Sequence, residues 1–365
     1  MKTAVIGGGI SGLTAAYLLK QKGIDVTLFE KNSYPGGNIK SELINGYLVE
    51  HGPSSTLETS PLLNKLFEEL GILVRKIYAS EEAKKRYILK DGKLYALPMS
   101  PTAFLKTKLF STSAKLRLLK EPFIKTKSNE LETIAEFTGR RLGREFLDYA
   151  INPFVAGVFA GNPYDLNVKS AFPKLYELEQ KYGSLIGGMI KSRKERKRRK
   201  EESKQSAKTF SFKNGLIELV NALYERTKTI FSLNTEVLDL RRIGGSYIIT
   251  FIKGDHFETE SFDSVILSIP AYFSSRLIRS FDNKLSEDLS NIYYPPVTVI
   301  TTGFKNNQFK SVPDGFGFLV PEKENRKILG SLWNSSIFPG RAPNGYSLLT
   351  NFIGGSRHPE LASES

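Results

Sequence analysis

The chain has 365 residues, of which 40% are hydrophobic and 25% charged, and its 52 Lys and Arg residues against 38 Asp and Glu residues give a net charge of +14 at pH 7. This composition predicts a globular chain that can bury its own core, and it excludes a disordered or fibrous one. Without cysteine, and with only three histidines, the chain excludes disulfides, thiolate metal sites, iron–sulfur clusters and cysteine nucleophiles, and no metal site is expected.

The first thirty residues predict a strand–helix–strand unit. Residues 2–6 have the pattern of a short buried strand, 10–22 that of a helix ended by Gly23, and 25–30 that of a second strand rich in β-forming residues. Such a unit forms a parallel strand pair with a right-handed crossover. Because the first strand begins at residue 2, we expect no targeting presequence.

The rest of the chain changes between helical and extended patterns. Asp91-Gly92 lies between two alternating runs within 86–97, which predicts a hairpin with a tight turn. Helices are expected at 60–76, across most of 102–190, where prolines interrupt them, and at 216–227; strands are expected at 236–240, 246–252, 257–262, 264–269, 297–304, 316–320 and 328–333. This order favours an open α/β domain that carries a largely helical second domain. No apolar run approaches the roughly 18 residues of a membrane-spanning helix.

A G-x-G-x-x-G motif lies between the first strand and its helix and comprises Gly7, Gly8, Gly9, Ile10, Ser11 and Gly12. In this context the first glycine permits a tight turn, the second lets the backbone approach a pyrophosphate, and the third allows close helix–strand packing. Glu30 ends the second strand, where a carboxylate can bind ribose hydroxyls. The alternative, a glycine-rich turn without a ligand, is disfavoured by this combination of strand, helix and acid.

FAD and NAD both use such a loop. A second glycine pair, Gly36-Gly37, follows Glu30 by six residues and allows another loop to approach the same cofactor, which suits the longer FAD. Taken alone, Pro35-Gly36 also fits an ordinary turn, which is the less favoured interpretation.

Taken with these features, further motifs make the chain resemble the amine-oxidase-type flavoprotein superfamily and, within it, the protoporphyrinogen oxidase family of haem synthesis. They occur in order along nearly the whole chain: Glu50–Ser55, Lys85-Arg86-Tyr87 with Gly92-Lys93-Leu94, Asn152–Gly157, Phe210–Gly215, Gly315–Pro321, Phe338–Pro343 and Phe352–Arg357. Each motif alone is weak, but the set is specific.

The resemblance implies FAD as the cofactor. It places cofactor contacts at Gly7–Gly12, Glu30, Lys31, Gly37, Asn38, Gly52, Pro53, Ser54, Ser55 and Val237, the last through its backbone at the adenine. His51 stands where the family usually has leucine. We favour packing within the cofactor loop over a role for His51 as a catalytic base.

The resemblance also implies oxidation of protoporphyrinogen IX to protoporphyrin IX with O2 as the acceptor. Arg86 matches an arginine that anchors a substrate propionate, Trp333 a ring that stacks on the substrate, and Gly157 a glycine that lines the cavity. From the residues alone, an exposed hairpin arginine and a core tryptophan are the competing interpretations. No catalytic side chain is expected, because the flavin performs the hydride chemistry.

The fold class is therefore α/β, with a Rossmann-like FAD-binding domain at 1–85 and 210–270 and a substrate domain at 86–97 and 271–365. A mainly helical, membrane-facing insert is expected at 98–209, with a basic loop at 191–208 that holds ten Lys and Arg residues and three Glu residues. Attraction to anionic lipid and a solvated loop are equally open interpretations of this loop. Nucleic-acid binding is disfavoured because no recognisable module accompanies it. The expected location is cytoplasmic, peripheral on the inner face of the membrane, and a homodimer is compatible with the resemblance.

Two alternatives to this function stay open. A coproporphyrinogen III oxidase differs only in substrate carboxylates and is poorly separated by sequence. The family also continues into a C-terminal segment with a Gly-Asp motif at the flavin, which this sequence lacks, so a truncated, non-catalytic relative is the second alternative.

Overall fold

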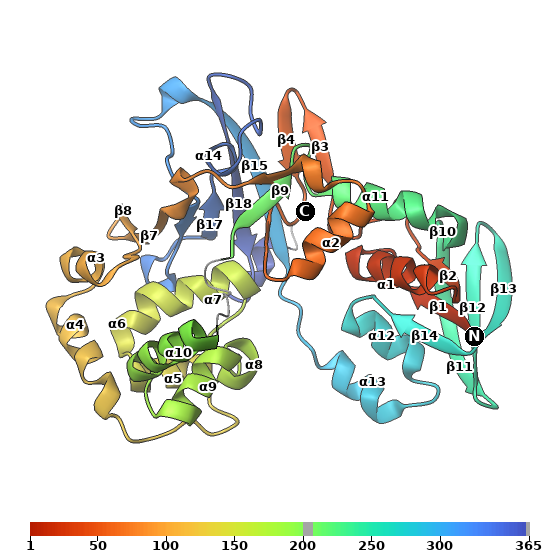
Figure 1. Ribbon diagram of the computed structural model, residues 1–365, viewed down its shortest axis with the longest axis horizontal. Coiled ribbons are helices and arrows are strands. Elements are labelled where there is room, and N and C mark those ends of the chain that lie inside the picture. The colour runs from red at the N-terminus through yellow and green to blue at the C-terminus, as the bar shows by residue number, and fades with distance from the viewer. Residues whose placement is uncertain (200–206, 363–365) are drawn as a thin grey trace. The chain divides into compact units, whose positions relative to one another are not determined.

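The computed structural model describes residues 1–199 and 207–362, with 193–199 described by their backbone alone. Its contacts divide the chain into two compact units, each built from two separate stretches (Figure 1). Unit 1 comprises Met1–Tyr78 and Lys208–Tyr294, and unit 2 comprises Ala79–Ala207 and Pro295–Ser365. The roles assigned to the domains from the sequence stay predictions.

A parallel sheet forms the centre of unit 1. Its strands are β1 (Lys2–Ile6), β2 (Asp25–Phe29), β10 (Phe231–Ser232) and β14 (Ser264–Leu267), in the order β10-β2-β1-β14. Helix α1 (Ile10–Gln21) connects β1 to β2, so the predicted strand–helix–strand unit is confirmed.

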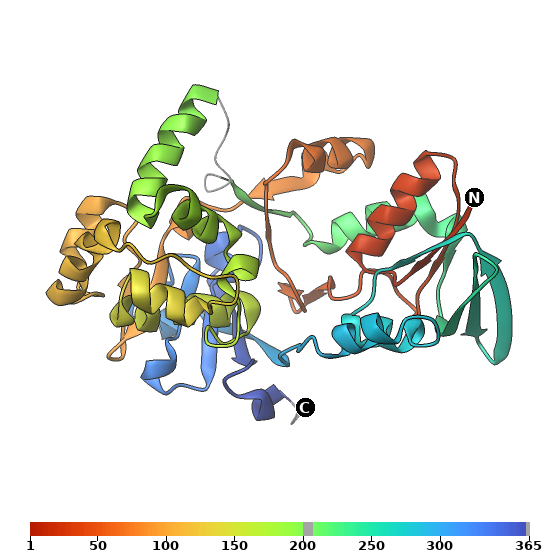
Figure 2. The same ribbon diagram turned by 90° about the horizontal axis from the view of Figure 1, so that it is seen from below.

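Unit 1 has further strands and helices, some of which cover the two faces of this sheet. They are the strands β3 (Ser41–Ile44), β4 (Tyr47–Glu50), β5 (Thr56–Leu57), β6 (Lys76–Tyr78), β9 (Thr209–Phe212), β11 (Thr235–Ile243), β12 (Ser246–Lys253) and β13 (His256–Phe262), and the helices α2 (Pro61–Glu69), α11 (Ile217–Thr227), α12 (Ala271–Ile278) and α13 (Asn283–Ser290). Val5 and Leu28 face a core shared with α1 and α11, which lie side by side (Figure 2). Phe29 faces the opposite core, formed with the antiparallel sheet β11-β12-β13.

A six-stranded sheet forms the centre of unit 2. Its strands, in spatial order, are β15 (Val297–Lys305), β18 (Tyr346–Gly354), β17 (Ile328–Leu332), β16 (Gly317–Leu319), β7 (Arg86–Lys90) and β8 (Lys93–Ala96). Only β16 and β7 pair in parallel. The predicted hairpin is present, with Asp91 and Gly92 both in the left-handed region at φ +51° and +69°.

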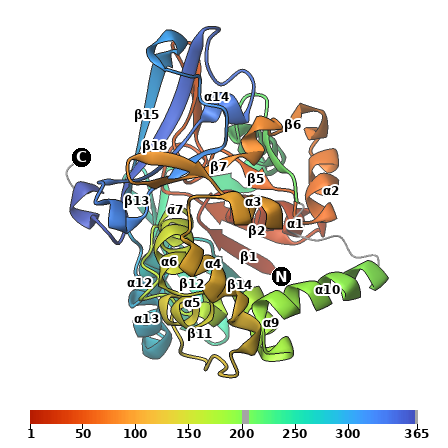
Figure 3. The same cartoon turned by 90° about the vertical axis from the view of Figure 1, so that its left-hand side faces the viewer.

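The helical part of unit 2 lies beside this sheet (Figure 3). Its helices are α3 (Pro101–Lys106), α4 (Thr112–Leu119), α5 (Ile134–Arg141), α6 (Arg144–Phe146), α7 (Asn152–Phe159), α8 (Val168–Ala171), α9 (Pro173–Tyr182) and α10 (Leu185–Arg199), with α14 (Asn334–Ile337) nearer the C-terminus. Ile88 of the sheet packs with Leu109, Phe110 and Tyr149 of the helical part.

The basic segment 191–208 departs from its predicted structure. It was expected to be a loop, but α10 continues through it as far as Arg199, so the prediction is wrong for this part. Residues 200–206 lie outside the described residues. No helix within the described ranges combines the length and apolar character needed to cross a bilayer.

Candidate functional site

Three glycines, in the loop after β1 and the first turn of α1, are required by the packing of the protein itself. Gly7 has a φ of +107°, and a Cβ there would lie 2.5 Å from the carbonyl oxygen of Ser268. A Cβ at Gly12 would lie 1.9 Å from the carbonyl oxygen of Gly7, and one at Gly8 would lie 2.7 Å from the ring of Phe231. These positions therefore exclude larger side chains whether or not a cofactor is bound.

Gly9 differs from its neighbours because a Cβ there would meet no atom of the described protein within 4 Å. It is the N-cap of α1, and no side chain of the described residues caps the helix. The first turn, which contains Ile10, Ser11 and Gly12, holds no acidic residue. Backbone N–H groups and the positive end of the helix dipole are thus presented beside open space, which fits a cofactor pyrophosphate.

Glu30 is buried at the end of β2 and is anchored to this loop. Its Oε2 accepts a 2.7 Å hydrogen bond from the backbone N–H of Gly8, and its Oε1 accepts from the backbone N–H and side-chain amide of Asn32, at 2.9 and 2.7 Å. Asn32, which sequence reasoning missed, therefore orients the carboxylate from the other side. The neighbouring Lys31 places its ammonium 4.7 Å from the ring centroid of Phe273, at the start of α12.

The second glycine pair contacts the first loop directly. The backbone N–H of Gly36 donates to the carbonyl oxygen of Gly8 at 2.8 Å, and Gly36 forms an isolated parallel bridge with Gly9. A Cβ at Gly37 would lie 3.3 Å from the Cα of Gly9. The structure thus brings the two predicted cofactor loops together.

The segment Gly52–Ser55 extends this arrangement through Asn38. A Cβ at Gly52 would lie 2.1 Å from the carbonyl oxygen of Asn38, so the two backbones touch. Pro53, Ser54 and Ser55 follow directly, and Ser54 is buried. The exposed His51 instead places its Nε2 2.8 Å from Oε2 of Glu42 on the β3–β4 hairpin.

Val237 lies on β11, which begins beside Glu30. The backbone N–H of Thr235 donates to the carbonyl oxygen of Glu30 at 2.9 Å, and the Val237 side chain packs against the core that contains Phe29. Unit 1 therefore contains all the predicted cofactor residues. The glycine loops, Glu30, Asn38 and Gly52 are joined by a continuous chain of contacts, and Val237 follows close to it along β11.

Arg86 lies in unit 2, at the start of β7, with its guanidinium 4.7 Å from the ring centroid of Phe316. The side chain reaches solvent, yet surrounding atoms desolvate the guanidinium and lower its pKa below the ordinary value. No carboxylate of the described residues pairs with it, whereas the adjacent Lys85 and Tyr87 both bind Asp314, at 2.5 and 3.0 Å. A partly desolvated, unpaired guanidinium is a suitable site for a carboxylate ligand.

Gly157 and Trp333 pack on opposite faces of the six-stranded sheet. Leu319 pairs with Ile88, two residues beyond Arg86, and a Cβ at Gly157 of α7 would lie 2.4 Å from a methyl group of Leu319. Since alternate residues of a strand share a face, Gly157 lies over the Arg86 face. The buried Trp333 ring lies 5.4 Å from the Tyr87 ring, on the other face of β7, although the guanidinium of Arg86 reaches Phe316, whose carbonyl oxygen accepts the Trp333 backbone N–H at 3.1 Å.

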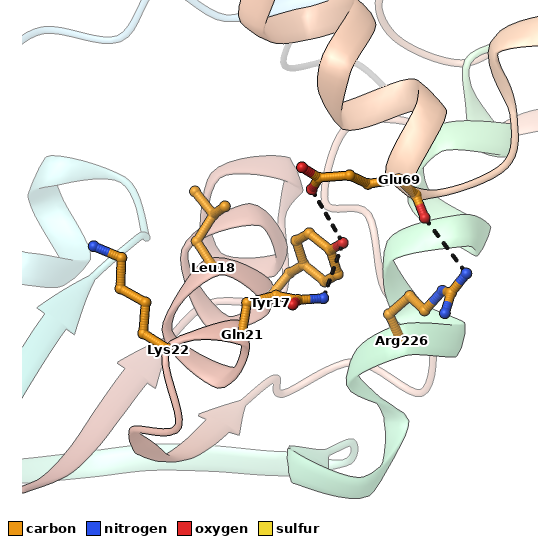
Figure 4. Close-up of a pocket in the computed structure, with 6 residues that line it drawn as sticks. All are labelled: Tyr17, Leu18, Gln21, Lys22, Glu69 and Arg226. Atoms are coloured by element: carbon orange, nitrogen blue, oxygen red, sulfur yellow. Dashed lines mark hydrogen bonds between the residues drawn. The ribbon is translucent and has the colours of Figure 1, made fainter.

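A further pocket, of about 450 Å³, lies at the C-terminal half of α1 (Figure 4). Tyr17 contacts Glu69 at 3.4 Å and Gln21 at 3.2 Å within it, and Leu18, Lys22 and Arg226 complete its lining. The pocket is at the other end of the helix from the glycine loop and does not belong to the cofactor site. Across residues 1–199 and 207–362, no three acidic or histidine side chains are grouped to hold a metal ion.

Comparison with known proteins agrees with this site. Residues 10–365 match the family described as flavin containing amine oxidoreductase, and the chain belongs to this family. It is therefore a flavin-dependent oxidoreductase with FAD as its cofactor, and its mixed α/β fold is that of the amine-oxidase-type flavoproteins.

Named relatives confirm the narrower resemblance to the protoporphyrinogen oxidases. The chain is 34% identical to protoporphyrinogen oxidase 2, chloroplastic/mitochondrial, of Arabidopsis thaliana, over all of this chain and 77% of the relative. It is 29% identical to coproporphyrinogen III oxidase of Bacillus subtilis (strain 168), over 96% of this chain and 76% of the relative.

Solved structures share the fold. A protein from Exiguobacterium sp. 255-15 superposes with a TM-score of 0.80 at 24% identity, covering all of this chain and 79% of that one. Cyclohexylamine oxidase from Brevibacterium oxydans IH-35A superposes with a TM-score of 0.69 at 15% identity, covering all of this chain and 77% of that one.

Proposed function

We propose that this chain is an oxygen-dependent protoporphyrinogen oxidase, which converts protoporphyrinogen IX to protoporphyrin IX. The relatives named above support the reaction and the choice of protoporphyrinogen IX. The observation that carries the substrate class, a porphyrinogen with carboxylate arms, is Arg86. Its partly desolvated guanidinium has no carboxylate of the described residues as a partner and adjoins the aromatic ring of Phe316. A substrate that combines an apolar macrocycle with carboxylate arms matches both features.

The residues of unit 1 fit FAD. Gly9 and the N-terminus of α1 would bind its pyrophosphate, while Glu30, held by Gly8 and Asn32, would accept hydrogen bonds from ribose hydroxyls. When bound, FAD supplies a hydride acceptor that O2 reoxidises. The protein then has to position the macrocycle, and Arg86 does so by binding a propionate that does not itself react.

Oxidation of coproporphyrinogen III is the second candidate, because the relative from Bacillus subtilis is named for it. The two substrates differ in the number of carboxylates, and both carry a propionate that Arg86 can bind. Arg86 therefore supports either substrate and does not separate them.

The test is to supply the purified chain with each porphyrinogen in air and to follow porphyrin fluorescence and O2 consumption. We expect one O2 consumed, and one H2O2 formed, for each pair of hydrogens removed, with protoporphyrinogen IX giving the higher kcat/KM. A higher kcat/KM for coproporphyrinogen III would assign the second function. Oxidation of neither substrate by flavin-loaded protein would contradict both.

We also infer that the helical insert contacts an anionic membrane surface. The surface from α3 to the short 3-10 helix η3 (Glu121–Phe123), called here the α3–η3 surface, carries exposed apolar side chains beside exposed lysines. These are Met99, Leu105, Leu116, Leu119 and Phe123 with Lys106, Lys108, Lys120 and Lys125. Lys115 donates to the carbonyl oxygens of Leu105 and Thr107, at 2.8 and 2.6 Å, and joins α4 to α3.

The charge of this surface supports the same inference. The only acidic residue of 99–127 is Glu121, which is fully buried, so no exposed acid within this segment opposes its lysines. Apolar side chains flanked by cations favour the interface of an anionic bilayer. A peripheral location on the cytoplasmic face of the membrane is the corresponding proposal. The homodimer stays a prediction.

A further inference from the structure

The turn that follows β18 holds both ends of helix α7. At the C-terminal end, the backbone N–H of Ser356 donates to the carbonyl oxygen of Ala160, the C-cap of the helix, at 2.7 Å. At the N-terminal end, Nη2 of Arg357 donates to Oδ1 of Asn152, the first residue of the helix, at 2.6 Å. Two consecutive residues thus bind the two ends of one helix.

The backbone of this turn fits closely against α7. Gly354 and Gly355 have φ values of +92° and +68°, and a Cβ at Gly355 would lie 2.8 Å from the carbonyl oxygen of Ala160. Ala160 is itself in the left-handed region, at φ +49°, which a residue other than glycine seldom adopts. The hydrogen bond from Ser356 therefore holds a helix end that is not at its backbone minimum.

Arg357 also joins the start of α7 to the end of β16. Its Nη1 donates to the carbonyl oxygen of Val320 at 2.6 Å. The same Asn152 Oδ1 accepts the backbone N–H of Glu322 at 3.0 Å, and Asn152 Nδ2 donates to a Glu322 carboxylate oxygen at 3.0 Å. Burial lowers the pKa of Arg357 below its ordinary value, with Glu322 opposing this effect, so the guanidinium is held in a largely desolvated position.

The position of α7 matters for the proposed substrate site. Gly157 brings the middle of the helix against Leu319, on the sheet face that also carries Arg86. Contact at Gly157 sets the closest approach of helix and sheet, but it does not fix the start of the helix. The start of the helix is held by the bonds of Arg357 to Asn152 and Val320, together with the two hydrogen bonds between Asn152 and Glu322.

We propose that Arg357 is a positioning residue that sets the spacing of α7 over the Arg86 face and thereby the fit of the substrate. The effect on substrate in this inference rests on the proposed function. The statement that Arg357 holds α7 in place does not. Replacing Arg357 should let α7 move without removing any group that touches the reacting atoms. Substrate binding should weaken while the rate at saturation is retained, because a displaced α7 weakens the binding of substrate and of transition state equally.

The experiment compares Arg357→Ala and Arg357→Lys with Arg326→Ala, all in the complete FAD-loaded chain. Arg326 is an exposed arginine of unit 2 for which the described residues provide no partner, so it is a matched control. Hydrogen exchange of the α7 amides measures how firmly Arg357 holds the helix, and steady-state kinetics measures the effect of its loss on KM and kcat. Flavin content and melting temperature report on the fold.

For Arg357→Ala we expect faster exchange confined to α7 and adjoining residues, and a KM raised on the order of tenfold with little change in kcat. Arg357→Lys keeps the charge but not the forked donors, so it should lie between wild type and alanine. Arg326→Ala should match wild type. If Arg357→Ala does not fold, Arg357→Lys becomes the deciding variant.

Unchanged hydrogen exchange of α7 in Arg357→Ala, or in Arg357→Lys if the alanine variant does not fold, would show that Arg357 does not hold the helix. Faster exchange with an unchanged KM, or a fall in kcat with flavin loss, would overturn the positioning role. A wild-type chain that oxidises neither porphyrinogen would overturn the proposed function instead, and the exchange measurement would still decide whether Arg357 holds α7.

Discussion

The backbone N–H of Gly36 donates a 2.8 Å hydrogen bond to the carbonyl oxygen of Gly8. This bond holds the second glycine loop on the first and places Gly37 against Gly9. Gly9 therefore lies against the backbone of the second loop and at the N-terminus of α1, while the space where its side chain would point stays open. Such a cradle accepts a phosphate group but no side chain in addition to it.

Replacing Gly9 by valine should abolish FAD binding without unfolding the protein. A Cβ at this position meets no described protein atom within 4 Å, and Gly9 has a φ of −68°, which valine adopts without strain. The added side chain would instead occupy the space proposed for the pyrophosphate. The flavin-to-protein absorbance ratio and the melting temperature of the apoprotein measure the two effects.

Gly12→Val is the contrasting variant. Its Cβ would lie 1.9 Å from the carbonyl oxygen of Gly7, so this substitution should destabilise the apoprotein as well as remove flavin. Full flavin occupancy in Gly9→Val would show that the pyrophosphate does not lie beside Gly9.

Local sequence predicted the cofactor half of the site because its signals are local. Glycines and β-forming residues mark the ends of β1, α1 and β2 within the first thirty residues. The predicted ends of these three elements agree with the structure to within one residue. The helix predicted at 60–76 is wrong beyond Glu69, because Gly71, at φ +73°, ends it and only a short 3-10 turn follows.

The substrate half of the site depends on strand pairing between segments that are distant in sequence, and the hydrophobic pattern of a sequence does not predict such pairing. Strand β18 was not predicted at all, although it is central to its sheet between β15 and β17. Its sequence mixes Ser, Thr and Asn with apolar residues and shows no strict alternation. The placement of Trp333 against Tyr87, the neighbour of Arg86, depends on the pairing of β7, β16 and β17, and no motif carries that information.

The contacts of Arg357 could not be predicted from the sequence either. Its motif, Phe352–Arg357, was recognised as part of the family resemblance, yet its partners Asn152 and Val320 are distant in sequence. A signal for Asn32 was present, since an asparagine two residues after Glu30 favours a local side-chain turn.

Arg86→Ala should lower kcat/KM by an amount that corresponds to about 1.5–3 kcal/mol, as for loss of a hydrogen bond to a charged group. Flavin content should not change, because Arg86 belongs to unit 2 and the predicted cofactor residues belong to unit 1. Steady-state kinetics with protoporphyrinogen IX measures the loss. Arg86→Lys should recover only part of it, since an ammonium cannot bind a carboxylate through a planar fork.

Lys85→Ala is the matched control for this prediction. Lys85 is adjacent in sequence but already pairs with Asp314 at 2.5 Å, so its loss should leave kcat/KM nearly unchanged. Equal effects of the two substitutions would argue that charge near β7, rather than Arg86 itself, attracts the substrate.

Glu179 should make the helical part of unit 2 sensitive to acid. Its burial alone would raise its pKa, but hydrogen bonds from Arg140, the Ser128 backbone and Arg141 outweigh this and lower the pKa below the ordinary 4.5. The folded state therefore binds a proton less readily than the unfolded state. The stabilisation is fully present above about pH 4.5 and is lost as the pH falls toward the lowered pKa.

Glu179→Gln should cost about 1.5–3 kcal/mol at neutral pH, because Arg140 and Arg141 lose their shared carboxylate but keep Glu132 and Glu121 as partners. Its melting temperature should fall less steeply than that of the wild type below pH 4.5. Glu177→Gln, an exposed substitution on the same helix, should behave like the wild type. Parallel pH profiles for wild type and Glu179→Gln would contradict the assignment.

The α3–η3 surface should bind anionic vesicles through both its apolar and its basic side chains. Leu119→Ser with Phe123→Ser removes two apolar side chains that are 67% and 81% exposed, and we expect roughly tenfold weaker binding as the apolar area buried in the interface is lost. Replacing Lys106, Lys108 and Lys120 by serine should weaken binding at low salt and have little effect at high salt, where surface attraction is screened.

Co-sedimentation with anionic and with zwitterionic vesicles measures these effects, and Val74→Ser in unit 1, at 92% exposed, is the matched control. Serine substitution across 191–200 separates this surface from the basic segment, since each is expected to contribute independently of the other. Oxidation of dispersed porphyrinogen should be unaffected by all of these changes. Binding that survives loss of the α3–η3 side chains but not loss of the basic segment would place the membrane contact on that segment alone.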